Sequence, residues 1–217
     1  GYRFRPRFDL KGTGLSKTFK LAGWAVGFVL VNQVALAVVS RLATSATADG
    51  TGAGLTVYNN AYLVFLLPHS LITVSLATAM VTSASKMAAA GDQAGTAAEV
   101  MRTMRLVTTA LVPAAVLLIA LGHPSARLLF GNGTGARDAP LIGWTIIAFA
   151  VGLVPFTIQH VCLRTYYALE RNRDTFFIQL IIAAVQIALS LALVLPVHRP
   201  DWVAPMLALS LSVAYGV

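Results

Sequence analysis

Six long apolar runs, separated by short polar segments, divide this chain from end to end. They lie near residues 21–40, 55–85, 104–121, 141–169, 176–197 and 203–217. An α-helix needs about 20 apolar residues to cross the hydrocarbon core of a bilayer, and most of these runs approach or exceed that length. Charged residues make up only 11% of the sequence, against roughly 25% in a typical soluble domain. We therefore expect an integral membrane protein.

The length and continuity of the runs favour helices over the strands of a membrane β-barrel. Barrel strands are only about 10 residues long and alternate polar with apolar side chains, whereas these runs are continuous. The expected fold is all-α: a polytopic transmembrane helix bundle of about six spans. The last run ends at Val217 and would be only about 22 Å long as a helix, so we expect a fragment of a larger protein.

The net charge of +8 is distributed unevenly between the two sides that alternating spans define. One side holds Arg3, Arg5, Arg7, Lys11, Lys17, Lys20, Lys86, Arg102, Arg105, Arg164, Arg171 and Arg173; the other holds Arg41, Arg127, Arg137 and Arg199. Basic residues accumulate on the cytoplasmic side of membrane proteins, which predicts a cytoplasmic N-terminal flank over residues 1–20. Lys86, Arg171 and Arg173 then belong to cytoplasmic flanks. Anionic head groups of membrane lipids are a sufficient partner for this charge, and no nucleic acid is expected.

Side-chain amides inside two of the runs are the first candidates for a binding site. Asn32 and Gln33 lie near the middle of the first run, and Asn59, Asn60 and Tyr62 lie near the outer end of the second. Asn32 and Gln33 either line a cavity and bind a sugar or peptide head group, or join helices by hydrogen bonds worth about 0.6 kcal/mol each. The second group either lines an exit path or bonds to interfacial water.

Two further features suggest a hinge and an anion contact. Pro68 lacks a backbone N–H and, with Ser70, marks either a bending point for alternating access or a static kink. Arg164 is the only charge inside the fourth run. Its guanidinium either binds a diphosphate through charged hydrogen bonds or extends to the membrane interface.

Enzyme, metal and cofactor chemistry find no support in the residue pattern. All acidic residues fall in flanks or loops: Asp9, Asp49, Asp92, Glu99, Asp138, Glu170, Asp174 and Asp201. His69 and His160 are single histidines on different runs, and Cys162 is the only cysteine. Acid–base and zinc catalysis need gathered groups, so we expect no catalytic residue, no metal site and no cofactor.

Three groups of residues resemble the MurJ/MviN lipid II flippases. They are Asn32-Gln33; the stretch from Tyr58-Asn59-Asn60-Ala61-Tyr62 through Leu67-Pro68 to Ser83-Ala84-Ser85; and the run Arg164-Thr165-Tyr166-Tyr167-Ala168-Leu169-Glu170-Arg171-Asn172-Arg173-Asp174-Thr175. The likeness extends over nearly the whole chain and is of an actinobacterial type. It implies a fourteen-helix fold in two pseudo-symmetric halves around a central cavity, as in multidrug and polysaccharide exporters. This chain would be a fragment of the C-terminal half, with residues 1–20 as the cytoplasmic connection between halves and 21–217 as the transmembrane bundle.

Two positions depart from the pattern of the family. Many members place a basic residue facing the cavity where this chain has Ala61, and some carry an acidic residue where this chain has Val39. The first departure leaves the pyrophosphate contact to Arg164, Lys86 or the amides in this half, or to the half of the protein that is absent from this chain. The second leaves sodium coupling through this helix without support.

The resemblance implies a function in bacterial cell-wall synthesis at the plasma membrane. The implied activity is the flipping of lipid II, an undecaprenyl-pyrophosphate-linked peptidoglycan precursor, to the outer leaflet by alternating access. The implied partners are lipid II, membrane lipids, the remaining half of the same protein and cell-wall synthesis proteins. The alternatives are an exporter of another lipid-linked saccharide or of a drug, and a non-transporting scaffold for cell-wall enzymes.

Overall fold

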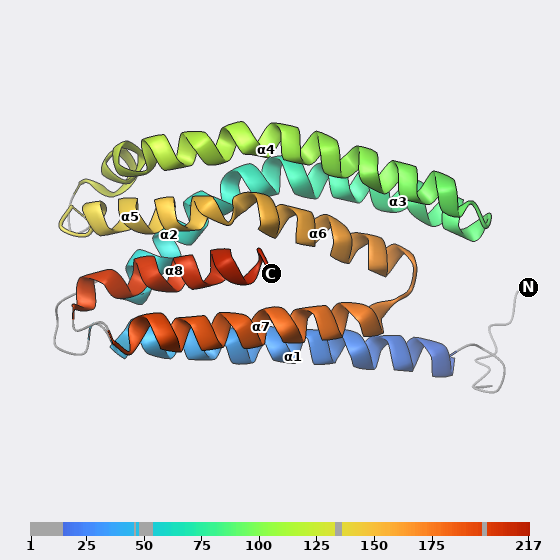
Figure 1. Ribbon diagram of the computed structural model, residues 1–217, viewed down its shortest axis with the longest axis horizontal. Helices are drawn as coiled ribbons and strands as arrows, with labels where there is room; N and C mark the ends of the chain where they lie inside the picture. The colour runs from blue at the N-terminus through green and yellow to red at the C-terminus, as the bar shows by residue number, and fades with distance from the viewer. Residues whose placement is uncertain (1–14, 46, 48–53, 133–135, 197–198) are drawn as a thin grey trace, which may run out of the picture.

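The computed structural model describes residues 15–45, 47, 54–132, 136–196 and 199–217, with side chains from Phe19 onward. These residues form the elements of Figure 1: α1 (Leu15–Ser45), α2 (Leu55–Pro68), the π-helical segment η1 (His69–Val74), α3 (Ser75–Ala89), α4 (Gln93–Phe130), α5 (Ala139–Val151), α6 (Leu153–Ala168), α7 (Asn172–Val194), the short 3-10 helix η3 (Pro200–Trp202) and α8 (Val203–Ala214). The expected basic segment 1–20 lies mostly outside the described residues, and α1 already begins at Leu15.

The predicted all-α membrane fold is confirmed. No strand occurs in the described ranges. Phe19–Ser45, Leu55–Ala89, Gln93–Phe130 and Asn172–Val194 are each long and apolar enough to cross a membrane, and α5 with α6 qualifies as a fifth, bent span. The sixth predicted run is represented by α8, whose 12 residues are too few to cross a bilayer by themselves.

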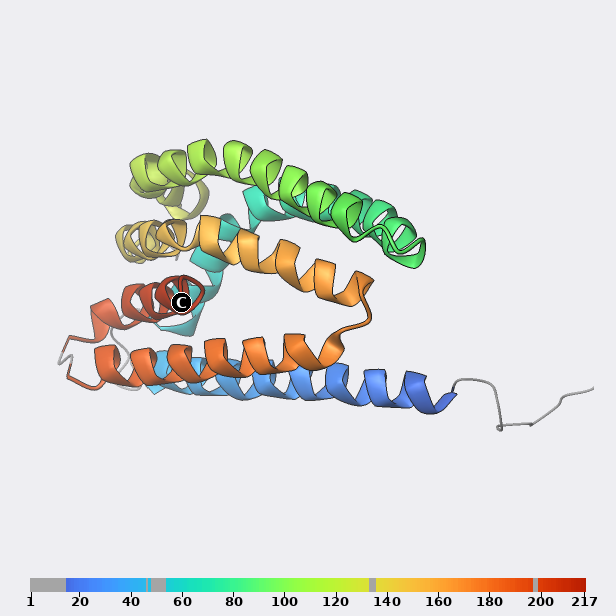
Figure 2. The same ribbon diagram turned by 45° about the vertical axis from the view of Figure 1, so that its right-hand side comes forward.

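The helices pack as two side groups with α8 between them. On one side, α1 lies against α7; on the other, α4 lies against α3, α5 and α6 (Figures 1 and 2). Helix α8 fills the space between α5 and α7. A buried core lies where α2, α5 and α8 meet: Phe65 and Phe149 are 2% and 0% exposed, their ring centroids are 5.2 Å apart, and Leu207 of the same cluster is fully buried.

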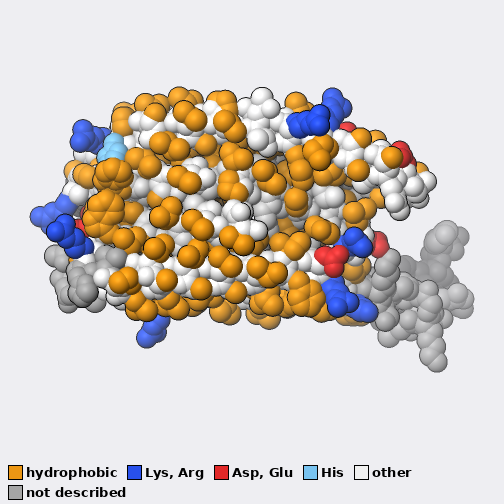
Figure 3. Space-filling model, in the orientation of Figure 1, with side chains coloured by type: hydrophobic (Ala, Val, Ile, Leu, Met, Phe, Trp, Pro, Cys, Tyr) orange, Lys and Arg blue, Asp and Glu red, His pale blue; other side chains and the backbone are white. Residues whose placement is uncertain are grey.

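The surface is that of a membrane protein. On the face that Figure 3 shows, hydrophobic side chains cover the flank of the bundle and charges gather toward its two ends. Large apolar residues such as Leu71 (73% exposed) and Leu117 (57% exposed) face outward, as lipid contact requires. We call the end that carries the α3–α4 and α6–α7 turns the basic end: among described side chains it holds Lys20, Lys86, Arg102, Arg105, Arg171 and Arg173.

The second run forms one long helix whose geometry changes at Pro68. Helix α2 ends at Pro68, η1 follows as a π-helix, and α3 resumes the α-helix at Ser75, with a change of direction between them (Figure 1). Proline cannot donate to the carbonyl one turn earlier, and its ring crowds that carbonyl. Hydroxyls of Ser70 and Ser75 donate to Leu67 O and Leu71 O at 3.0 Å each, which satisfies carbonyls in the altered turn. The predicted change of geometry at Pro68 is thus present.

The fourth run, expected over 141–169, is broken at Gly152 into α5 and α6, which meet at 51°. The Gly152 N–H donates to Phe149 O at 2.9 Å, so Ala148 O loses its usual helical donor. Ser212 Oγ of α8 donates to Ala148 O instead, at 2.8 Å. A Cβ on Gly152 would lie 2.6 Å from Ser212 Cα, so only glycine allows α8 to come this close.

The connection between the second and third spans is much shorter than the gap between the expected runs 55–85 and 104–121. Residues 88–99 are polar and Ala/Gly-rich, but only Ala90, Gly91 and Asp92 lie outside helices. The Asp92 side chain caps α4 by accepting from the Gly95 N–H at 2.8 Å, and alanine-rich sequence extends the helix from there. As a result α4 runs for 38 residues, well beyond the expected span 104–121.

Candidate functional site

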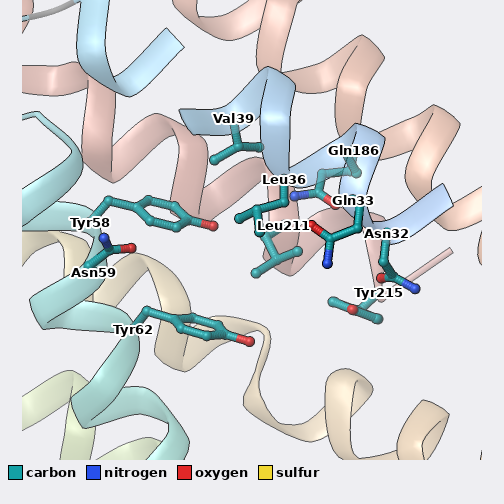
Figure 4. Close-up of a pocket in the computed structure, with 11 residues that line it drawn as sticks. Asn32, Gln33, Leu36, Val39, Tyr58, Asn59, Tyr62, Gln186, Leu211 and Tyr215 are labelled. Atoms are coloured by element: carbon teal, nitrogen blue, oxygen red, sulfur yellow. The ribbon is translucent and has the colours of Figure 1, made fainter. Parts of the chain in front are cut away.

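A cavity of about 290 Å³ opens between α1, α2, α7 and α8. Its wall contains four side-chain amides and three tyrosines, interleaved with aliphatic side chains. The residues are Asn32, Gln33, Ala35, Leu36, Val39, Tyr58, Asn59, Tyr62, Gln186, Leu211 and Tyr215 (Figure 4). Four of the sequence candidates, Asn32, Gln33, Asn59 and Tyr62, therefore meet at one place. No carboxylate, arginine or lysine is among the described residues of this wall.

The α1 wall is held to α7 by an amide pair. Asn32 Nδ2 donates to Phe28 O at 3.0 Å, and its Oδ1 accepts from Gln179 Nε2 of α7 at 3.0 Å. Asn32 thus joins two helices and lines the cavity as well. Its neighbour Gln33 is exposed, and its amide lies toward the middle of the cavity (Figure 4).

The α2 wall is an aromatic surface. Tyr58 and Tyr62 lie one helical turn apart with nearly parallel rings, 6.3 Å between centroids at 9°. Both contact the buried ring of Phe149, at 5.1 and 5.5 Å between centroids, so core packing fixes their orientation. Their hydroxyl groups point across the cavity toward α1 (Figure 4). This wall can stack against a ring and donate hydrogen bonds.

The α7 and α8 walls add residues that were not nominated from sequence, as Tyr58 does on α2. Gln179 and Gln186 are seven residues apart, so they lie on one face of α7, and both are buried. Gln186 lines the cavity, as does Tyr215 just past the end of α8. The spacing of the two glutamines was a usable signal, because amides on one face of an apolar helix point to the interior. Tyr215 carried no such signal.

Asn60 is not among the residues that line the cavity, although its neighbour Asn59 is. One residue along a helix turns the side chain by about 100°, so two adjacent asparagines cannot share a face. Asn60 is half-buried on another side of α2.

Arg164 lies outside the cavity, on the part of α6 nearer the basic end. It shares one face of the helix with His160 and Tyr167, at spacings of four and three residues. Tyr167 packs against Phe28 of α1, with 6.5 Å between ring centroids, so this face is directed toward α1. Arg164 is half-buried, and its Nε donates to His160 Nε2 at 3.5 Å.

The hinge candidates lie together at the junction of α2 and η1. Pro68 is half-buried and ends α2, while Ser70 is exposed and bonds within its own helix. In the same segment the buried Thr73 Oγ1 has no hydrogen-bond partner among the described residues. In this arrangement the segment therefore contains a buried hydroxyl whose hydrogen-bonding capacity is unused.

The flank candidates are surface residues of the basic end. Lys86 is exposed near the end of α3. Arg171 forms a 3.6 Å ion pair with Asp174, both well exposed, and Arg173 lies 5.7 Å from the Phe177 ring centroid. Such exposed pairs contribute at most about 1 kcal/mol.

The two histidines, which lie on different runs of the sequence, meet. His69 of η1 and His160 of α6 pack edge to face with 4.8 Å between ring centroids. Sequence could not reveal this, because the two positions are far apart in the chain. Among the described residues, no group of three His, Cys, Asp or Glu side chains could hold a metal ion.

Comparison with known proteins gives consistent results. Residues 1–217 match the family Lipid II flippase MurJ. A probable lipid II flippase MurJ of Rhizobium meliloti (strain 1021) is 24% identical over 131 residues, which is 60% of this chain and 24% of that protein. The solved structure of lipid II flippase MurJ in an inward closed conformation superposes with a TM-score of 0.76 at 21% identity, covering 98% of this chain and 43% of that one. The chain spans less than half the length of these relatives, and the structural likeness is one of fold.

Proposed function

Because the chain belongs to the lipid II flippase MurJ family, we propose that it is part of a flippase that moves lipid II outward across the bacterial plasma membrane by alternating access. The observation that carries this proposal is the cavity inside a lipid-facing bundle, with amides and tyrosines on its wall. A saccharide–peptide head group is neutral over much of its surface and rich in hydroxyls and amides. Asn32, Gln33, Asn59, Tyr62 and Gln186 offer matching hydrogen bonds.

The proposed orientation has the basic end in the cytoplasm. Basic residues gather there, and positively charged segments are retained on the cytoplasmic side. The N-terminal flank is then cytoplasmic. In this orientation Arg164 lies in the cytoplasmic half of the bundle and the amide cavity reaches toward the outer leaflet.

Arg164 is the proposed contact for the diphosphate of the substrate. A guanidinium can bind two phosphate oxygens at once, and its partly buried position strengthens charged hydrogen bonds. The precursor would meet this charge first and the neutral cavity afterwards. Lys86, Arg171 and Arg173 are exposed and more suited to anionic head groups of membrane lipids.

Pro68, Ser70 and the following π-helical turn are the proposed bending point. π-helical turns inside α-helices are rare and are common at functional sites. The buried Thr73 hydroxyl has no hydrogen-bond partner among the described residues. This supports a bending point here, since a rearranged turn could provide that partner and so offset part of the free energy of bending.

The remaining half of the protein is a required partner in this proposal. Transport sites of such folds lie at the interface of two repeats, and this chain covers 43% of the matched structure. No bond is made or broken in moving a lipid, so no enzyme activity is proposed. A cationic drug is a poorer fit as substrate, because the described wall of the cavity has no carboxylate. A scaffold for cell-wall enzymes would need no cavity at all, but cell-wall synthesis proteins remain proposed partners.

Adjacent asparagines offer a matched test of this proposal. In the full-length protein reconstituted in liposomes, Asn59→Ala should slow flipping of lipid II by roughly 2- to 12-fold, the effect of one hydrogen bond. Asn60→Ala removes the same group from a position outside the cavity and should leave the rate near that of the parent. Equal effects of the two substitutions, or none from either, would argue against a substrate path through this cavity.

A further inference from the structure

A contact between η1 and α6 places His69 in a closely defined position. His69 is 4% exposed and its Nδ1 lies 3.2 Å from Thr157 Oγ1. Its ring packs on Phe156 and His160, with centroids 4.6 and 4.8 Å away. All three partners belong to one stretch of α6, so the first residue of the π-helical segment is fixed against that helix.

His160 stands between this fixed ring and Arg164. Its imidazole packs edge to face on His69 at 86° and accepts a hydrogen bond from Arg164 Nε at Nε2. An imidazole nitrogen can accept only when it carries no proton, so the bond requires a neutral His160 with its proton on Nδ1. His160 is therefore held on one side and holds Arg164 on the other.

The direction of this bond decides where the guanidinium lies. His160 is one helical turn, about 6 Å, nearer the middle of the membrane than Arg164. An unrestrained arginine so close to a helix end would extend its charge outward to the interface. The bond to His160 draws the guanidinium inward instead. It also occupies only Nε, and neither terminal nitrogen has a hydrogen-bond partner among the described residues, so both can bind phosphate oxygens.

We infer that His160, supported by His69, is a positioning residue that holds Arg164 turned into the bundle with its two terminal nitrogens free for a diphosphate. This inference rests on the proposed role of Arg164 as the head-group contact. It adds a link between that contact and the π-helical segment after Pro68, since His69 belongs to that segment.

The test measures binding of undecaprenyl diphosphate and of a neutral diacylglycerol to the full-length protein in detergent. His160→Gln keeps an acceptor near the position of Nε2, whereas His160→Asn reaches only to that of Nδ1. We expect diphosphate affinity to fall roughly 2- to 12-fold in His160→Asn and His160→Leu, the effect of one hydrogen bond, and to be largely kept in His160→Gln. Arg164→Ala should lose roughly 10- to 150-fold.

The Arg164→Ala background separates a positioning effect of His160 from a general loss of structure. In Arg164→Ala, a second substitution at His160 should change diphosphate affinity no further, because both act through one group. Binding of the neutral lipid should be unaffected throughout. Parent-like affinity in His160→Leu, a His160 effect that persists without Arg164, or equal losses for the neutral lipid would each overturn the inference. Parent-like affinity in Arg164→Ala would overturn the proposed head-group contact as well, while lipid II transport itself is decided separately by Asn59 and Asn60.

Discussion

Asn32 illustrates how one residue can serve both packing and the cavity. Its amide joins α1 to α7 through Gln179 and also forms part of the cavity wall. The next residue, Gln33, is exposed to the cavity. Within a membrane an amide needs a partner, so the loss of one member leaves the other unsatisfied. The two neighbours should therefore respond differently to loss of the amide.

The prediction at this scale concerns stability. A double-mutant cycle of Asn32→Leu and Gln179→Leu should give a coupling free energy of about 0.6 kcal/mol, as for other interhelical hydrogen bonds in membranes. The free energy of unfolding of the full-length protein in mixed micelles measures it. Gln33→Leu, the control, should change that free energy by less than about 0.5 kcal/mol. Additive effects of Asn32→Leu and Gln179→Leu would contradict a structural bond between them.

Sequence could identify part of this wall and not the rest. Four residues could be predicted because polar groups inside a membrane span are energetically costly and usually face the interior or a site: Asn32, Gln33, Asn59 and Tyr62. Separating Asn59 from Asn60 requires the rotation of α2, which depends on packing against Phe149. Tyr215 enters the cavity only because α8 ends beside it, and apolar periodicity does not encode where a short helix ends against its neighbours.

At the scale of elements, two spans are interrupted by different means. Pro68 announces its break in the sequence, because proline removes a backbone bond wherever it lies in a helix. The break at Gly152 lies three residues before Pro155, which has no N–H to donate to Val151 O, so the sequence carries a proline signal here as well. Proline alone is not decisive, since α4 continues through Pro113 and Pro124. Helix α8 approaches at this break, and Ser212 donates to the released carbonyl of Ala148. That contact with α8 cannot be found from the sequence of the span alone.

One methyl group added at Gly152 should have a large effect on stability. Gly152→Ala places a Cβ 2.6 Å from Ser212 Cα, so α8 must move away and the bond from Ser212 is strained. Overpacking of this kind costs about 1–3 kcal/mol. Thermal unfolding of the full-length protein in detergent should show the loss. Gly23→Ala is the matched control: nothing lies within 4 Å of its Cβ, and alanine favours the helix, so its stability should not fall. Unchanged stability of Gly152→Ala would contradict the close approach.

At the scale of the whole molecule, charge distribution is the feature that sequence predicts best. The ends of the bundle alternate along the chain, so counting bases in successive polar segments needs only the approximate positions of the spans. The misjudged start of α4 left that count unchanged, because Arg102 and Arg105 lie toward the basic end whether the helix starts at Gln93 or later. Tertiary contacts such as that of His69 with His160 tolerate no such error, since they depend on rotation and depth of two helices.

The last prediction is that Arg173 faces the cytoplasm and Arg137 the exterior. Both are exposed, at opposite ends of the bundle, so cysteines there would be accessible to reagents. Cys162, the only cysteine of these 217 residues, and any cysteine in the rest of the full-length protein are first replaced by serine so that each labelled protein has a single thiol. In intact cells that produce the full-length protein, a membrane-impermeant maleimide should label Arg137→Cys and leave Arg173→Cys unmodified, because excess basic residues keep the basic end inside. Permeabilised cells provide the control, in which both thiols should react. Labelling of Arg173→Cys but not Arg137→Cys in intact cells would invert the bundle, and Arg164 would then lie in the outer half, where it could not meet a precursor made in the cytoplasm.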